Sequence, residues 1–272
     1  MKIFSLYHDF FLFLKAVSAS SDIWDAYRTY YYRPHREFLD AYFSHFPMLD
    51  PMTLRQRVEK IKQADYSWLK TLLSASAPEK IILRAYQRCL RVVPPPSQPH
   101  VYFFVGFFSP DGFVMNLEGK PVICFGLERF KDFMLLKILF AHEYAHFLLN
   151  YTTADVPEGK KLMRLLISEG AATYFSKLAF PHHRLSDHFL FRRDRLNWCQ
   201  ENEARIRDVY CSGRFSNEEL MDFYFKGNPE INLPPRAAKY LGYQAVKKYL
   251  AKHRGESIGT LLLSKKQSEL VC

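Results

Sequence analysis

Two histidines four residues apart, with a glutamate after the first, lie in an apolar stretch of this sequence. His142, Glu143 and His146 form an HExxH motif. On an α-helix, side chains at positions i and i+4 lie one above the other, so both imidazoles can reach one metal ion. Zinc suits this geometry, and Glu143 projects to the same side, where it can act as a general base on a metal-bound water.

The surroundings of the motif favour a buried helix. Apolar residues run from Phe130 to Leu149, with Lys131, Asp132 and Lys137 as the polar interruptions. Burying two histidines and a glutamate without partners costs roughly 1 to 3 kcal/mol per group, and a metal ion removes that cost. A five-residue motif also arises by chance, so the alternative of hydrogen-bonded core histidines beside a buried glutamate stays open.

A zinc site of this kind needs a third protein ligand, and Glu169 is the candidate. It interrupts an apolar stretch from residue 165 to residue 174, and Gly170, Ala171 and Ala172 follow it. Such small residues let a second helix come close to the first. A third histidine after a short turn is excluded, because Asn150 to Gly159 contains none. The other interpretation of Glu169 is one end of a surface ion pair.

These residues carry a family resemblance. The HExxH motif followed by Ser168-Glu169-Gly170 on a later helix resembles the gluzincin clan of metallopeptidases, whose third ligand is a glutamate from a second helix. Over residues 101 to 250 the chain also resembles a bacterial family of predicted zinc-dependent proteases of unknown substrate. The segment from Pro234 to Tyr243 contributes to this second resemblance, with Ala238-Lys239 where that family has Gly-Tyr.

The resemblance implies a zincin-like metallopeptidase fold and a zinc-dependent peptidase. His142, His146 and Glu169 would hold Zn²⁺, and Glu143 would take the proton of the bound water that attacks a peptide bond. By position, Tyr240 and Tyr243 are the candidates for stabilising the oxyanion. A peptide or protein substrate would pair with an edge strand, for which Val122 to Gly126 is the prediction.

Two other classes of function stay open. In the first, the zinc site is present but non-catalytic, and the protein binds or scaffolds a partner. In the second, the net charge of +10 attracts an anionic surface or nucleic acid and the motif is coincidental. No recognised nucleic-acid module accompanies the charge, so nucleic acid is not the expected partner.

The first 93 residues are predicted to be a helical region. Asp22 is placed to cap a helix, Pro34 to break it, and Asp50-Pro51 and Ala77-Pro78 to start two more. The proline-rich stretch from Val93 to Pro99 fits neither a helix nor a central strand, so it predicts a domain boundary.

The second predicted domain, residues 94–272, is the zincin-like catalytic domain. Strands are expected at 100–108, 113–117 and 121–127, forming a small antiparallel sheet before the metal-motif helix. Helices are expected at about 160–178, 195–210, 217–225 and 236–253. The predicted fold class is therefore α+β, mainly α.

Cysteine content and hydropathy indicate the compartment. The five cysteines are odd in number and lack CxxC spacing, which favours a reducing cytoplasm. No apolar run reaches the roughly 18 residues that span a bilayer. The first twenty residues resemble a short signal sequence, but His8, Asp9 and Lys15 interrupt it, so a core-packing first helix is preferred. His182-His183 is interpreted as an exposed pair.

Overall fold

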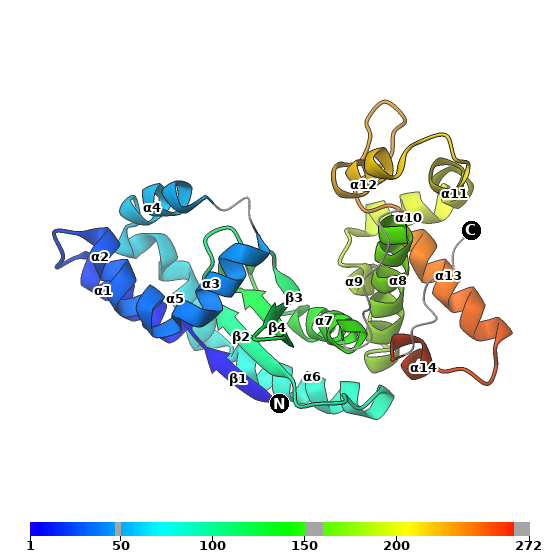
Figure 1. Cartoon of the computed structure of the whole chain (residues 1–272). Helices are drawn as coiled ribbons and strands as arrows, with labels where there is room; N and C mark the ends of the chain where they lie inside the picture. The colour runs from blue at the N-terminus through cyan, green and yellow to red at the C-terminus, as the bar shows by residue number, and fades with distance from the viewer. Residues whose placement is uncertain (47–49, 151–159, 264–272) are drawn as a thin grey trace. The chain divides into compact units, whose positions relative to one another are not determined.

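The computed structural model of the chain describes residues 1–46, 50–150 and 160–263. It is mainly helical with one small sheet, so the predicted α+β, mainly α class is confirmed (Figure 1). The chain divides into an N-terminal unit, Met1–Arg84 with Ser97–Lys137, and a C-terminal unit, Ala85–Pro96 with Ile138–Cys272. These units divide the chain at other points than the boundary predicted at residue 93.

The sheet of the N-terminal unit has four strands in the order β1 (Lys2–Ser5), β2 (His100–Phe104), β4 (Lys120–Gly126) and β3 (Gly112–Leu117). β1 pairs parallel with β2, and β2 pairs parallel with β4. Only β3 and β4, a hairpin, pair antiparallel. The predicted antiparallel sheet is therefore wrong, because the hairpin places β3 at the edge and inserts β4 beside β2.

Two further predictions about the sheet are corrected by this strand order. The segment Val122 to Gly126 belongs to β4, whose two hydrogen-bonding sides are taken by β2 and β3, so it is no free edge for a substrate. Residues 2–5 form a strand, although the first ninety residues were expected to be helical. Helix α1 (Tyr7–Val17) then buries Phe10 and Phe13 completely, as expected of a core-packing helix.

The helix signals of the first ninety residues are confirmed where they depend on local chemistry. The carboxylate of Asp22 accepts a hydrogen bond from the backbone N–H of Asp25, and Asp50 does the same for Thr53. Pro34 lies in a 3₁₀ turn that separates two helices. The elements are α2 (Ile23–Tyr27), η1 (Arg28–Tyr32), η2 (Arg33–His35), α3 (Arg36–His45), α4 (Pro51–Glu59), η3 (Gln63–Tyr66), α5 (Ser67–Ala75) and α6 (Pro78–Val92).

Aromatic side chains fill the core of the N-terminal unit. The ring of Phe38 stacks on that of Tyr102, with the centroids 4.5 Å apart, which joins α3 to β2. The Tyr31 hydroxyl donates to the carbonyl of Val105, and the Val105 N–H donates back to the Tyr31 oxygen. Aromatic residues of the first helices, such as Tyr31 and Phe38, therefore join these helices to β2 and the loop that follows it.

The C-terminal unit is helical throughout the part that the structure describes. The metal-motif helix α7 (Leu136–Asn150) begins six residues later than predicted from Phe130, because the Asp132 carboxylate accepts the N–H of Met134 and holds a turn. The other helices are α8 (Lys161–Ala179), α9 (Leu185–Phe189), α10 (Arg193–Glu201), α11 (Glu203–Cys211), α12 (Asn217–Lys226), α13 (Lys239–Lys252) and α14 (Ile258–Leu262). The loop predicted at Asn150 to Gly159 lies, apart from Asn150, outside the described residues.

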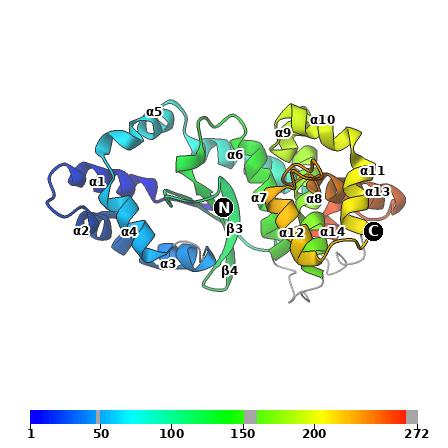
Figure 2. The ribbon, with the colours of Figure 1, turned by 90° about the horizontal axis from the view of Figure 1, so that it is seen from above.

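Helices α8 and α13 lie side by side and form the most extensive contact between two described elements (Figures 1 and 2). Gly170 and Gly242 make this approach possible. A Cβ atom on Gly170 would lie 2.1 Å from the carbonyl carbon of Gly242, and one on Gly242 would lie 1.8 Å from the carbonyl oxygen of Leu166. Gly170 therefore serves the contact with α13, whereas the sequence interpretation assigned it to contact with the metal-motif helix.

Candidate metal centre

His142, His146 and Glu169 lie together in the C-terminal unit, as their spacing predicts. His142 and His146 project from consecutive turns of α7, and Glu169 reaches them from α8. The two Nε2 atoms are 3.2 Å apart, and the Glu169 carboxylate oxygens lie 3.4 Å from His142 Nε2 and 3.3 Å from His146 Nε2. His142 is buried, while the side chains of the other two are each about one-fifth exposed.

These distances fit a tetrahedral zinc site. Ligand atoms at about 2.0–2.1 Å from a tetrahedral Zn²⁺ lie about 3.3–3.4 Å from one another. The two imidazole nitrogens lie at about that distance from each other, and each lies at it from a different oxygen of Glu169, Oε2 for His142 and Oε1 for His146. One donor atom from each residue can be chosen so that the three lie within 4.8 Å of one another. Two imidazoles and one carboxylate are also a donor set that zinc accepts. The residues present therefore fit the ion.

Lys239, at the first position of α13, joins the cluster. Its ammonium lies 3.0 Å from Glu169 Oε2, and the residue is 2% exposed. The sequence interpretation missed this contact, because a lysine at the start of a helix with further lysines is most simply a solvated residue. The one available signal was its position three residues before Gly242, on the face that turns toward α8.

Burial and the neighbouring charges shift the titration of the cluster. Burial lowers the pKa of His142 to about 3 and raises that of Glu143 to about 7. For Glu169, the effect of burial is outweighed by Lys239 and the two imidazoles, which hold its pKa well below the usual range. For His146, burial lowers the pKa, but the Glu169 carboxylate outweighs it and the pKa is raised. Neutral His142 and ionised Glu169 are the forms that bind a metal.

Tyr240 and Tyr243, predicted as oxyanion stabilisers, belong to the hydrophobic core of the C-terminal unit. Tyr240 is 5% exposed and its hydroxyl accepts a hydrogen bond from the Gln244 side chain. The ring of Tyr243 packs edge-on against Phe189 at 5.3 Å between centroids and also contacts Tyr174. The contacts recorded for both rings are with this core, whereas His142, His146 and Glu169 form the cluster.

The histidines after α8 form a separate arrangement. His182 is exposed, as predicted for the pair, and His183 is half-buried with its Nδ1 atom 3.5 Å from the Asp187 carboxylate. His188, which the sequence interpretation did not consider, is fully buried, and its Nδ1 lies 3.1 Å from the Ser176 hydroxyl. Its Nε2 atom is buried without a hydrogen-bond partner among the described residues.

Because His188 is buried, we expect the protein to lose stability in weak acid. Burial lowers its pKa to about 4 from the 6.5 of an exposed histidine; His183 and Lys177 add to this, and Asp187 opposes it. As the pH falls below 6.5 the unfolded chain takes up the proton first, so stability present above pH 6.5 is lost toward pH 4, by about 3 kcal/mol. Urea unfolding at several pH values measures this slope.

In the His188→Gln variant this part of the pH dependence should disappear. His182→Gln, which removes an exposed histidine of the same segment, is the matched control and should keep the wild-type slope. An unchanged slope in His188→Gln would show that another group causes the acid sensitivity.

Comparison with known proteins assigns the chain to a family. A family model described as "Gliding motility protein GldB" matches residues 2–271, which includes the helices α7 and α8 of the metal cluster. Comparison with curated proteins gives no match, and comparison with solved structures gives none either. Among the described residues, no helix has the length and apolar character needed to cross a membrane.

This assignment corrects the function predicted from the motif. The resemblance to gluzincin metallopeptidases and to a family of zinc-dependent proteases is wrong, and with it the prediction of a hydrolase that cleaves peptide bonds. The motif misled because HExxH and a distant glutamate constrain few positions, whereas the family model matches nearly the whole chain. The predicted cytoplasmic location is wrong as well, since the family is one of lipoproteins of the cell envelope.

Proposed function

Because the chain belongs to the GldB family of gliding motility proteins, we propose that it is a non-catalytic, partner-binding component of the machinery that moves the cell. The family match over residues 2–271 carries this proposal, since it includes residues of both units. The partners expected for a gliding motility protein are other proteins rather than a peptide substrate. This is the binding or scaffold alternative of the sequence interpretation.

We further propose that the C-terminal unit holds Zn²⁺ through His142, His146 and Glu169 in a zincin-like pair of helices. The separations of 3.2 to 3.4 Å between their ligand atoms support this assignment. When bound, zinc would tie α7 to α8 and so stabilise the fold, because a metal that binds only the folded chain adds its binding free energy to the stability. Glu143 would then be a buried side chain beside the site and not a general base.

Lys239 gives the cluster a stabilising contact that does not depend on a metal ion. Its ammonium already neutralises Glu169 at 3.0 Å, so the carboxylate has a buried counter-ion of its own. A positive charge at that distance also repels a divalent cation and weakens its binding. Zinc bound beside this ammonium would therefore be held less tightly than by the same three ligands without it.

Gliding of cells that carry single substitutions tests the proposal. In cells lacking the chromosomal copy, Glu143→Gln should restore gliding to the wild-type level, because the variant keeps the shape of the side chain and changes only its charge. His146→Ala should have reduced zinc content and restore gliding less well. His182→Ala, which removes an exposed histidine outside the cluster, is the control. Colony spreading and immunoblots of protein level are the measurements.

The outcome for Glu143→Gln decides between binding and catalysis. A Glu143→Gln protein that accumulates normally and keeps its zinc, but fails to support gliding, would contradict a non-catalytic role. Equal metal content in wild type and His146→Ala would contradict the zinc assignment and leave the partner-binding role standing.

A further inference from the structure

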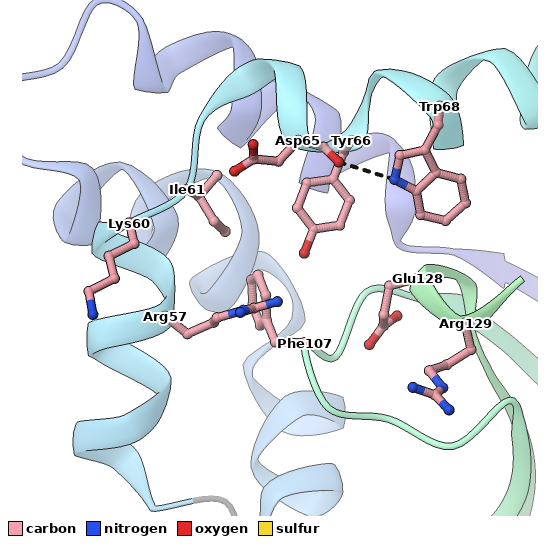
Figure 3. Close-up of a pocket in the computed structure, with 9 residues that line it drawn as sticks. All are labelled: Arg57, Lys60, Ile61, Asp65, Tyr66, Trp68, Phe107, Glu128 and Arg129. Atoms are coloured by element: carbon pink, nitrogen blue, oxygen red, sulfur yellow. Dashed lines mark hydrogen bonds between the residues drawn. The ribbon is translucent and has the colours of Figure 1, made fainter.

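A pocket of about 340 Å³ lies in the N-terminal unit, far along the sequence from the metal cluster (Figure 3). Its walls come from α4, η3 and α5 on one side, and from the loop after β2 and the turn η4 (Leu127–Arg129) on the other. All the lining residues belong to the same unit. The volume is that of a small binding site, at the lower end of the range for ligand pockets.

The two carboxylate oxygens of Glu128, which lines this pocket, differ in their hydrogen bonding. Oε1 accepts hydrogen bonds from the N–H of Gly106 at 3.0 Å, the N–H of Ser109 at 3.3 Å and the Ser109 hydroxyl at 2.7 Å. Oε2 is buried and has no hydrogen-bond partner among the described residues. A buried carboxylate oxygen without a donor is costly, and burial accordingly raises the pKa of Glu128. A ligand that donates a hydrogen bond to Oε2 would remove this cost.

The loop that binds Oε1 is held in a strained shape. Phe107 has a φ of +65°, a left-handed conformation that is unfavourable for a bulky residue, and its side chain is buried against the pocket. Tyr31 holds Val105 through two hydrogen bonds, and Tyr42 donates to the carbonyl of Gly106. Strain maintained by this many contacts is typical of a functional site, and here it fixes the orientation of Glu128.

Aromatic and cationic side chains surround Glu128. Figure 3 shows Tyr66 above, with its hydroxyl directed down into the pocket, and Arg57 and Glu128 on either side of the space below it. Tyr66 and Phe107 are buried, so their rings form apolar walls beside the carboxylate. Arg129 lines the pocket from the other side and lies 3.2 Å from Asp111, with its side chain more than half exposed.

We propose that this pocket binds a small zwitterion, a molecule that carries an ammonium group and, a few ångströms away, a carboxylate or phosphate. The ammonium donates to Glu128 Oε2 and lies against the rings of Tyr66 and Phe107, a combination of carboxylate and aromatic faces that favours cations. The anionic group lies at the opening, where Arg57 and Lys60 supply positive charge.

The charges of the lining exclude either half of such a ligand alone. A simple anion drawn in by Arg57, Lys60 and Arg129 would meet the Glu128 carboxylate, which repels it. A simple cation that fits Glu128 would meet the positive charges of Arg57 and Lys60, which outnumber the one carboxylate of Asp65, while Arg129 is paired with Asp111. Two sources share the required chemistry, namely amino acids or short peptides and the phosphoethanolamine group of lipids.

Isothermal titration calorimetry on the full chain tests this proposal with four probes. Glycylglycine and phosphoethanolamine represent the two zwitterionic sources, and acetate and ethylamine represent each half alone. At least one zwitterion should bind, and more tightly than either half. Preference for glycylglycine identifies a peptide-like ligand, and preference for phosphoethanolamine identifies a headgroup-like one; both outcomes support the proposal.

Two variants locate the binding. Glu128→Gln keeps one oxygen for the loop donors and places an N–H₂ group at the other position, so zwitterion affinity should fall on the order of 10- to 100-fold. Arg57→Gln should weaken binding by about two- to fivefold. Arg55→Gln, two residues earlier on α4 and outside the pocket, is the matched control with unchanged affinity.

Either of two results would overturn the proposal. The first is that no zwitterion binds more tightly than acetate and ethylamine. The second is that a variant folded by circular dichroism, Glu128→Gln or Arg57→Gln, binds as the wild type does. Because Arg57 is exposed, its variant remains informative even if Glu128→Gln fails to fold.

Discussion

The Glu169→Leu variant is expected to lose its zinc and to lower the free energy of unfolding of the C-terminal unit by about 3 to 5 kcal/mol. The loss of zinc follows from the removal of one of three ligands. The loss of stability follows from Lys239, whose ammonium is 2% exposed and has Glu169 as its counter-ion at 3.0 Å. Without the carboxylate, a positive charge remains buried and uncompensated. Metal analysis and urea unfolding measure the two effects.

A double variant separates the two effects. In Glu169→Leu/Lys239→Met both charges of the buried pair are replaced by apolar groups of similar size, which is neutral or stabilising in many proteins. Stability should therefore return toward that of the zinc-free wild type, while zinc should remain absent. A double variant as unstable as Glu169→Leu would show that the ion pair is not the source of the loss.

Lys239→Met alone gives the complementary result. It leaves Glu169 with the two imidazoles and removes the positive charge that repels a divalent cation. Zinc should then bind more tightly. At the same zinc concentration it should raise the urea concentration at the unfolding midpoint further than it does in the wild type, because a lower Kd gives more stabilisation. Unfolding with added zinc and with a chelator gives the comparison.

Gly242→Ala is expected to destabilise the C-terminal unit by about 3 kcal/mol or more, because the new methyl group has no space. It would lie 1.8 Å from the carbonyl oxygen of Leu166, and neither backbone can move without separating α8 from α13. The melting temperature should fall by about 6 to 12 °C. Separation of the helices would also move Lys239 away from Glu169, so the ion pair weakens with the packing.

The matched control for this substitution is Gly255→Ala. Gly255 has no atoms of other residues within 4 Å of an added Cβ atom and no left-handed φ, so its replacement should leave the melting temperature nearly unchanged. Gly170→Ala, on the facing helix, should reproduce the effect of Gly242→Ala. A melting temperature for Gly242→Ala equal to that of the control would mean that the helices do not approach as closely as described.

Local signals in the sequence were sufficient for part of this structure. The cluster of His142, His146 and Glu169 followed from helix periodicity and from the rarity of acidic residues on an apolar face. The capping aspartates Asp22 and Asp50 followed from side-chain chemistry that acts over three residues. Each of these features depends on neighbours within a few turns of the same chain.

Other features depended on contacts between distant segments. Strand β1 is four residues long and shows no periodicity that distinguishes it from the start of a helix, so its pairing with β2, almost one hundred residues away, defines it. The central position of β4 likewise depends on a distant segment, because β4 pairs with β2 as well as with its hairpin partner β3. The same holds for Lys239, whose partner Glu169 is seventy positions earlier.

The sequence by itself determined which side chains could bind a metal ion. Residue type identifies possible ligands, and the spacing of His142 and His146 along one helix shows that both can reach the same ion. It did not determine what surrounds them. The tertiary structure decided that a buried ammonium lies beside the carboxylate of Glu169. It also decided that one carboxylate oxygen of Glu128 is buried without a hydrogen-bond partner among the described residues. The physical reason is that electrostatics at a buried site is set by all charges within a few ångströms, whichever segments supply them.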